Sequence, residues 1–362
     1  MNSKERVRNA LTRKPVDRVP IFMWFHPQTA KHLARLLEIP ERHVSYVLGD
    51  DVRQTWVNNN YAMEGIVHEH ENERHTDFWN ITWVKKGDFN QVEEHPLKNS
   101  SVDAVAQYRF PFEHIDSLMK LMEPVVKFER EYFIGCDVSP CFFEMYCRIR
   151  GMENAFFDFV ENPELTEIML KKCGDFAMAL AQAAVSRYHL DWLWTGDDVG
   201  SQNGMMLSPD TWRKMIKPHL RDIFAVAKAA NLFAAFHSCG SIRPIIPDLI
   251  EIGLDVLNPI QCNCPGMVPF DLKKEFGKKL CFMGGIDTQD MLPHSTPEQV
   301  YAATSRLIES MTSDGGGYIL AASHTVPPET SDENIFAMYN AAGISKQEIF
   351  DKAADIRKHS FV

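Results

Sequence analysis

From about residue 130 onward the chain alternates short, apolar, β-rich runs with longer amphipathic segments. The runs expected as strands are 132–136, 192–195, 232–236, 256–257, 280–283 and 318–321. The segments expected as helices are 163–188, 209–230, 242–252 and 296–313, and Pro163, Pro209 and Pro297 stand near helix starts, where a missing N–H costs nothing. Strand, helix and parallel strand in repetition predict a right-handed α/β fold.

The residues that follow each run decide between an open sheet and a closed barrel. Five successive runs lead directly into polar residues: Gly196-Asp-Asp198, His237-Ser-Cys-Gly240, Asn258-Pro-Ile-Gln261, Gly284-Gly-Ile-Asp287 and Ala322-Ser-His324. An open doubly wound sheet gathers such groups mainly at one switch point. A barrel brings the carboxyl ends of all its strands to one mouth, where active sites form. We therefore predict a single (β/α)₈ TIM-type barrel.

The first third of the chain has a more mixed pattern. Helices are expected at 3–13 and 29–37, a strand at 19–24, and the aromatic stretch 75–83 alternates like a strand or hairpin. Pro111 marks the one internal boundary that the pattern offers, but too little apolar sequence precedes it for a separate core. We expect residues 1–362 to form one domain, with a helical and hairpin extension plus the first barrel elements in 1–120 and the main repeats in 121–362.

Composition excludes several classes of protein. The net charge of −11 argues against a nucleic-acid binder. No apolar run reaches 18 residues, so no membrane span is expected, and the start of the chain lacks the apolar core of a secretory signal. Eight cysteines in a chain of 362 residues do not make a disulfide framework. We expect a cytoplasmic enzyme with reduced thiols that acts on a small molecule, and a homodimer as the commonest assembly.

His237-Ser-Cys239 carries the strongest chemical signal. An imidazole and a thiolate two residues apart, just after a strand, can face one point and suit Zn²⁺. His324, after the last expected strand, is the predicted third ligand, and the competing thiols are those of Cys262, Cys264 and Cys281. Three ligands leave one position open, as in catalytic zinc sites. The alternative is a hydrogen-bonded histidine beside a buried thiol, which is the commoner origin of such a pair.

Further polar residues are candidates for catalysis or substrate binding. The predicted catalytic residues are Asp197, Asp287 and Gln261; the predicted substrate-binding residues are His26, Asp198 and Asn258. Paired carboxylates can share a proton or orient a histidine ligand. Adjacent aspartates can instead cap the next helix, an explanation that suits Asp198 better than Asp197. His26 has the alternative of an ordinary surface position.

Taken together, these motifs resemble the uroporphyrinogen decarboxylase superfamily, and most closely its branch of zinc-dependent corrinoid methyltransferases. The resemblance covers nearly the whole chain. The matching segments are Lys4-Glu-Arg-Val7, Asp17-Arg-Val-Pro20, Arg150-Gly151, Gly196-Asp-Asp-Val-Gly-Ser-Gln202, Ser208-Pro209, His237-Ser-Cys-Gly240, Gly284-Gly-Ile-Asp287, Ser323-His-Thr325, Glu333-Asn334 and Met338-Tyr339. The family implies a barrel, a small-molecule substrate and, for this branch, a corrinoid bound to a separate partner protein.

Two departures from the family pattern shape the functional prediction. Decarboxylases of this family carry Arg-Gln-Ala-Gly-Arg after the first strand, whereas this chain has His26-Pro-Gln-Thr-Ala-Lys31 without an arginine pair. Porphyrinogen carboxylates need such bidentate cations, so we do not expect that activity. The zinc methyltransferases use His-x-Cys plus a later cysteine, and the matching late position here is His324.

The expected ligand set has an electrostatic consequence. Zinc with one thiolate and two imidazoles keeps about one net positive charge, which favours polarising an oxygen and weakens a bound thiolate as a nucleophile. We predict zinc-activated methyl transfer between a small methylated compound or a thiol and a corrinoid protein. The alternatives are a metal-independent carboxy-lyase for a smaller acid, with Asp287 or Asp197 as proton donor, and a binding barrel without turnover.

Overall fold

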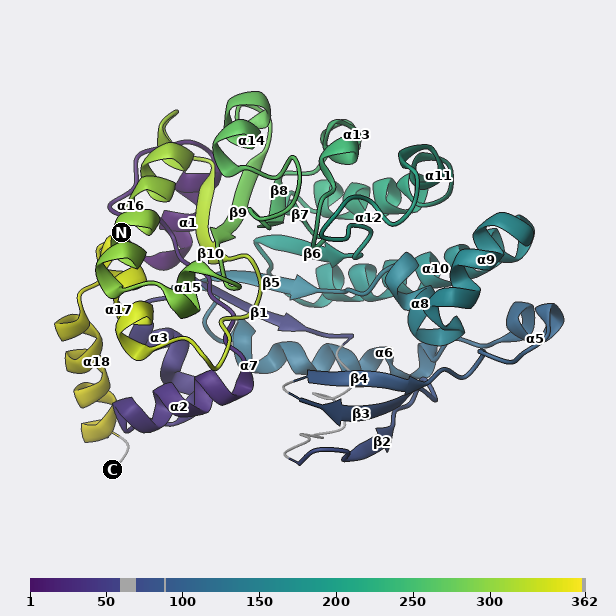
Figure 1. Ribbon diagram of the computed structural model, residues 1–362, viewed down its shortest axis with the longest axis horizontal. Helices are drawn as coiled ribbons and strands as arrows, with labels where there is room; N and C mark the ends of the chain where they lie inside the picture. The colour runs from purple at the N-terminus through teal and green to yellow at the C-terminus, as the bar shows by residue number, and fades with distance from the viewer. Residues whose placement is uncertain (59–69, 88, 360–362) are drawn as a thin grey trace.

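A curled parallel sheet of seven strands forms the centre of the protein (Figure 1). The computed structural model describes residues 1–58, 70–87 and 89–359. The strands lie in the order β1-β5-β6-β7-β8-β9-β10, and their bounds are β1 Val52–Trp56, β5 Phe133–Asp137, β6 Trp192–Gly196, β7 Phe233–His237, β8 Val256–Ile260, β9 Cys281–Ile286 and β10 Tyr318–Ala322. Six of these confirm the strands expected from the sequence after residue 130.

Helices cover the outer face of the sheet. In the first half they are α1 Ser3–Leu11, α2 Pro27–Leu37, η1 Glu41–His43, α3 Val44–Leu48, α5 Val102–Gln107, η2 Phe112–His114, α6 Ile115–Met119, η3 Lys120–Met122, α7 Glu123–Val126, α8 Phe143–Arg150, α9 Met152–Glu161 and α10 Pro163–Arg187. The others are α11 Pro209–Met215, α12 Lys217–Ala229, η4 Arg243–Ile245, α13 Ile246–Glu251, α14 Pro269–Phe276, α15 Met291–His294, α16 Pro297–Thr312, α17 Asp332–Ala341 and α18 Lys346–His359.

The expected first strand, 19–24, is not a regular strand, and the eight-stranded barrel is therefore not confirmed. Ile21 and Phe25 form isolated parallel bridges with Leu320 and Val326, beside β10. On the other side, the Asp51 N–H donates to the Ile21 carbonyl over 2.8 Å. Pro20 has no N–H to donate, which interrupts a ladder at this point. The segment thus lies between β10 and the start of β1 without completing a strand.

A second sheet of three antiparallel strands confirms the hairpin expected from the aromatic stretch. Its strands are β2 Arg74–Thr76, β3 Thr82–Lys86 and β4 Phe89–Glu94, in the order β2-β3-β4. Asp77 shapes the turn between β2 and β3, because its carboxylate accepts hydrogen bonds from the backbone of Trp79 and Ile81 and from Nε1 of Trp83. The hairpin is therefore fixed by a buried acid as well as by its apolar side chains.

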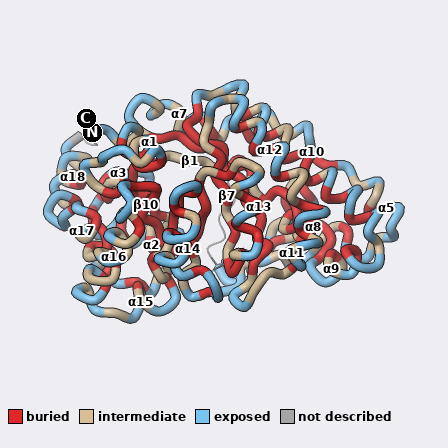
Figure 2. The backbone as a smooth tube through the Cα atoms, turned by 90° about the horizontal axis from the view of Figure 1, so that it is seen from above, coloured by how far each residue is buried: buried red, intermediate tan, exposed pale blue. Residues whose placement is uncertain are grey.

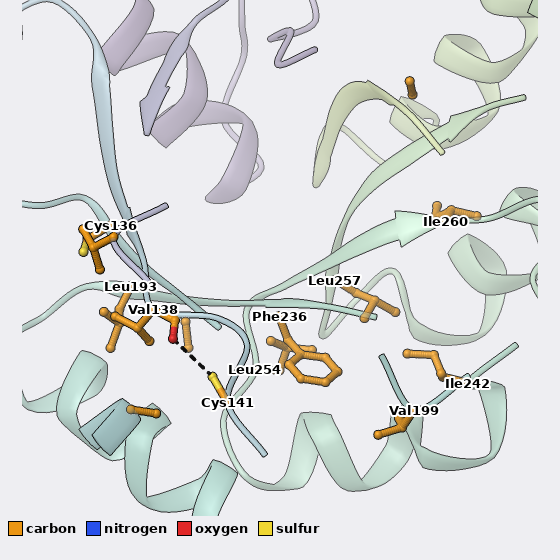
Figure 3. Close-up of a cluster of buried hydrophobic side chains, with 14 of the residues drawn as sticks. Cys136, Val138, Cys141, Leu193, Val199, Phe236, Ile242, Leu254, Leu257 and Ile260 are labelled. Atoms are coloured by element: carbon orange, nitrogen blue, oxygen red, sulfur yellow. Dashed lines mark hydrogen bonds between the residues drawn. The ribbon is translucent and has the colours of Figure 1, made fainter. Parts of the chain in front are cut away.

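Side chains alternate between two apolar cores on the two faces of the large sheet. Along β6, Trp192 and Trp194 belong to the inner cluster, which α1 joins through Val7 and Leu11. The intervening Leu193 belongs to the larger cluster between sheet and helices, part of which is drawn in Figure 3. This alternation matters for the site. His237, Asn258 and Asp137 lie at positions of their strands whose side chains point toward the inner cluster.

The burial pattern follows from these layers. Figure 2 shows buried backbone through the strands and the inner sides of the helices, and exposed backbone along the outer rim. Among the described residues, no helix is both long and apolar enough to cross a membrane.

Candidate metal centre

The centre lies at the carboxyl ends of β6, β7 and β8. His237 is the last residue of β7, where the register pairs it with Gly196 of β6 and Asn258 of β8. Strand parity turns its ring inward, as it does the side chain of Ala235 in the inner cluster. The sequence thus delivers His237 and the following loop to the mouth of the curled sheet, as expected.

Three side chains bring potential ligand atoms together at this point. One donor atom each from Asp198, His237 and Cys239 lies within 4.8 Å of the other two. Nε2 of His237 is 3.4 Å from Sγ of Cys239 and 3.6 Å from Oδ1 of Asp198. A set of one nitrogen, one sulfur and one oxygen fits Zn²⁺, whereas Mg²⁺ and Ca²⁺ prefer oxygen alone. Of the described residues, these three form the group able to hold a metal ion.

The loop that carries Cys239 is held by neighbouring loops. The backbone N–H of Cys239 donates to Oδ1 of Asp198 over 2.8 Å, and that of Gly240 donates to Oε1 of Gln261 over 2.7 Å. The N–H of Ser238 donates to the carbonyl of Asn258 over 2.9 Å. Each successive N–H thus has an acceptor, so the ligand atoms are positioned before any ion binds.

Two predicted site residues therefore act on the loop itself. Gln261 holds Gly240 through its amide oxygen, and Asn258 accepts from Nδ1 of His237 at 2.6 Å. Asn258 is 1% exposed, which leaves it little contact with solvent or with a ligand at the mouth. The roles of Gln261 in catalysis and Asn258 in substrate binding stay predictions.

Aromatic rings flank the histidine. The Trp24 ring centroid lies 5.6 Å and the Trp194 centroid 6.4 Å from that of His237. Trp24 belongs to the segment beside β10, and Trp194 points inward from β6. These rings exclude water from one side of the imidazole, which strengthens electrostatic interactions there.

His324 is not part of the three-residue group, so the structure does not assemble the predicted set of His237, Cys239 and His324. Its Nδ1 lies 3.0 Å from Oγ1 of Thr325, and its side chain reaches solvent at the mouth. Surrounding protein lowers the pKa of His324, and the positive charge of His237 lowers it further. His324 is thus close enough to His237 for the charge of that ring to lower its pKa, and its role as a ligand stays a prediction.

His26 is buried, so the surface alternative for this residue is wrong. It is 4% exposed, and its ring nitrogen accepts from the N–H of Gln28 at the start of α2. Its ring centroid lies 5.3 Å from that of Phe89, which in turn lies 6.4 Å from that of His324. The start of β4 therefore lies beside two histidines at the mouth.

The two adjacent aspartates have different surroundings. Asp198 joins the metal group, whereas the Asp197 carboxylate accepts from the N–H groups of Phe143 and Glu144 at the start of α8. The prediction that one of these aspartates caps the next helix is wrong, because Ser208 caps α11 and Asp197 instead binds the start of α8, an earlier helix. Burial raises the pKa of Asp197 to about 8, although those hydrogen bonds lower it. A catalytic role for Asp197 stays a prediction.

Asp287 organises its own loop. Its carboxylate accepts from the backbone of Gln289, Asp290 and Met291 and from Nδ2 of Asn263. These four contacts are the geometry of an aspartate that fixes a turn. Its predicted catalytic role is not tested by them, but the carboxylate is already engaged.

The competing thiols do not join the group. Cys281 begins β9, at the opposite end of the sheet, and its Sγ donates to the carbonyl of Leu11. Cys262 contacts the side chain of Asn263, and burial raises its pKa to about 11. Cys264 is buried. Cys239 is therefore the thiol that the fold presents beside an imidazole.

Sequence reasoning missed Asp137. It ends β5, is 6% exposed, and accepts hydrogen bonds from the backbone and hydroxyl of Ser139. Burial raises its pKa to about 7, while those hydrogen bonds and the charge of His237 lower it. Its position directly after an apolar run is the same signal that singled out Asp197, so the sequence could have identified it.

Comparisons with known proteins show the family and the fold of the chain. The family model described as "Uroporphyrinogen decarboxylase (URO-D)" matches residues 81–343. A methylcobamide:CoM methyltransferase of Methanosarcina mazei is 22% identical over 348 residues, which cover 94% of this chain and 97% of that protein. A solved methyltransferase structure from M. mazei superposes with a TM-score of 0.64 at 18% identity, covering 95% and 98% of the two chains. This likeness shows the fold.

A second curated relative matches over a shorter region. A methylated-thiol–coenzyme M methyltransferase of M. mazei is 26% identical over 161 residues, or 44% of this chain. The match spans about two fifths (41%) of that relative's length.

Proposed function

This chain belongs to the uroporphyrinogen decarboxylase family, and from that premise we propose that it is a zinc-dependent methyltransferase working with a corrinoid protein. The observation that carries the proposal is the meeting of Asp198, His237 and Cys239 within 4.8 Å at the mouth. The methyltransferase relatives support the reaction class, although their identity to this chain is low.

The ligand set proposed from the structure changes the expected charge. When bound by Asp198, His237 and Cys239, zinc would act as a Lewis acid that lowers the pKa of a substrate thiol. One thiolate and one carboxylate make the centre about neutral, instead of leaving the one positive charge expected for two imidazoles. A neutral centre weakens a bound thiolate less as a nucleophile. The proposal therefore favours a thiol as methyl acceptor over activation of an ether or hydroxyl oxygen.

Side chains of this chain position the imidazole of His237 and keep water away from one side of it. Trp24 and Trp194 shield one side of His237. The Asp137 carboxyl, whose pKa burial raises to about 7, can hold a proton near the centre at neutral pH. We also infer that segment 19–25, hydrogen-bonded on both sides, takes the place of the eighth barrel strand.

Replacing Cys239 with serine tests the proposal. Purified wild-type protein should contain about one zinc per chain and transfer methyl groups between methylcobalamin and a thiol. Cys239→Ser should lose zinc and lower the transfer rate by more than about 100-fold, because a hydroxyl is a far poorer zinc ligand. Cys264→Ser, at the neighbouring buried thiol, is the matched control and should retain zinc.

The alternatives predict different results. A metal-independent carboxy-lyase would remain active without zinc, and a binding barrel would hold zinc without any methyl transfer. Zinc-free wild-type protein, or equal zinc content in Cys239→Ser and Cys264→Ser, would reject the proposed centre.

A further inference from the structure

We propose that Asn258 is a positioning residue that fixes the tautomer of His237 and thereby aims Nε2 at the metal position. The inference rests on the proposed metal centre, because it assigns a role toward the same ion. Its basis is the contact at 2.6 Å between Oδ1 of Asn258 and Nδ1 of His237.

The orientation of the asparagine amide follows from its second contact. Nδ2 of Asn258 donates to the carbonyl of Met283 on β9 over 3.5 Å. An amide nitrogen facing a carbonyl leaves the amide oxygen facing His237, and that oxygen can only accept. Nδ1 of His237 must therefore carry the proton in this hydrogen bond.

The consequence appears on the other side of the ring. A neutral imidazole with its proton on Nδ1 has its free lone pair on Nε2. That atom is the one 3.4 Å from Sγ of Cys239 and 3.6 Å from Oδ1 of Asp198. With the proton on Nε2 instead, the ring would offer no lone pair to an ion held by the other two residues.

Asn258 is itself firmly placed. It lies opposite His237 in the register of β7 and β8, it is 1% exposed, and its carbonyl accepts from the N–H of Ser238. Strand parity puts both side chains on the inward face, so they meet without any loop rearrangement. An orienting partner of this kind is worth about 10–100-fold in metal affinity where it has been removed from other sites.

A pair of leucine variants separates positioning from general support. Asn258→Leu removes the acceptor at nearly constant size, and Gln261→Leu removes the hydrogen bond to Gly240 from the same strand end without touching the His237 ring. We expect Asn258→Leu to weaken zinc binding by about 10–100-fold in a chelator competition, and Gln261→Leu to weaken it much less. Thermal unfolding of both variants reports whether each one folds.

The ring nitrogens provide a readout that does not depend on activity. ¹⁵N NMR of zinc-loaded protein with labelled histidine should show the His237 proton on Nδ1 and Nε2 bound to the metal, in the wild type and in Gln261→Leu. In Asn258→Leu this signature should weaken, and Asn258→Asp, which keeps an acceptor, should restore it.

The outcomes keep the two proposals apart. A wild-type His237 protonated on Nε2, or equal loss of zinc affinity in folded Asn258→Leu and Gln261→Leu, overturns the role of Asn258. Absence of zinc binding in the wild type overturns the proposed function, whereas both outcomes above are measured on protein that does bind zinc.

Discussion

The two ends of the central sheet handle buried charge in opposite ways. At the amino-terminal end, Asp51 is 0% exposed and its carboxylate accepts from the guanidinium groups of Arg6 and Arg18. At the carboxyl end, Asp137 and Asp197 are also buried, at 6% and 1% exposure, yet neither has a lysine or arginine partner among the described residues. At the amino-terminal end, arginine side chains neutralise the charge of the Asp51 carboxylate. At the carboxyl end, the described residues provide no such cation for Asp137 or Asp197.

The ion pairs at the amino-terminal end of the sheet stabilise the fold. Asp191, just before β6, pairs with Lys4 at 3.1 Å and Arg8 at 2.7 Å, so that α1 is tied to the sheet by charge as well as by its apolar face. Lys273, also buried, pairs with Asp314 at 2.7 Å.

The carboxyl end has the features of a functional site. Burial raises the pKa of Asp137 to about 7 and that of Asp197 to about 8. Buried acids with raised pKa values cluster at active sites, and here they lie at the same end of the sheet as a thiol and an imidazole. Substitutions at the amino-terminal end should therefore change the free energy of unfolding, and substitutions at the carboxyl end should change zinc affinity.

The largest expected effect is at the amino-terminal end. Asp51→Ala should lower the free energy of unfolding by about 3–5 kcal/mol, because it leaves the guanidinium of Arg18 without a carboxylate and removes the buried one of the two that bind Arg6. Urea unfolding measures this loss, and zinc affinity of the folded fraction should not change. Asp17→Ala removes the 43% exposed carboxylate that also binds Arg6, and it should cost less than about 1 kcal/mol. Equal losses in the two variants would contradict the distinction.

A smaller effect is expected at the carboxyl end, where Asp198 and His324 compete for the third ligand position. Asp198→Ala should weaken zinc binding by more than about 100-fold, because it removes a ligand and not only an orienting partner, with little change in unfolding free energy. His324→Ala should weaken it by less than about threefold, because His324 lies outside the group of three. Competition with a chromogenic chelator measures both, and the reverse order would restore His324 as the ligand.

The smallest effect concerns Asp50, an exception at the amino-terminal end. Burial raises its pKa to about 7, although the hydroxyl of Tyr339 donates to it over 2.7 Å. The folded state therefore keeps a proton that the unfolded chain loses above about pH 4, so stability should fall between about pH 4 and 7 and level off above. The slope from one such group is at most about 1.4 kcal/mol per pH unit.

Asp50→Asn should flatten that dependence, because the amide keeps an acceptor for Tyr339 and has no proton to lose. Urea unfolding at pH 5, 6, 7 and 8 measures the slope for both proteins. An unchanged slope in the variant would assign the dependence to another group.

The sequence predicts strands well where both faces are apolar. Trp192–Gly196 and Tyr318–Ala322 are buried throughout, so their runs are unmistakable. The missed strand, Val52–Trp56, carries Arg53 and Gln54, whose partners come from distant segments: the ring of Tyr132 and Nε1 of Trp192. Such partners are tertiary, so local apolarity could not reveal them.

The site shows the same limit at the level of single residues. His237 and Cys239 are two apart after a strand, so their convergence follows from local geometry. Asp197 and Asp198 are adjacent, and only the position of α8 decides that one binds the start of that helix while the other faces the thiol. The position of His324 depends on the path of the loop after β10, and the segments that pack against this loop set that path.

X-ray absorption at the zinc edge tests the central claim most directly. We expect zinc-loaded protein to show one sulfur ligand at about 2.3 Å together with nitrogen and oxygen ligands at about 2.0–2.2 Å. Cys239→Ser, loaded at a zinc concentration high enough to offset its weaker binding, should lose the sulfur signal. Two or more sulfur ligands, or a spectrum unchanged by that substitution, would contradict a centre built from Asp198, His237 and Cys239.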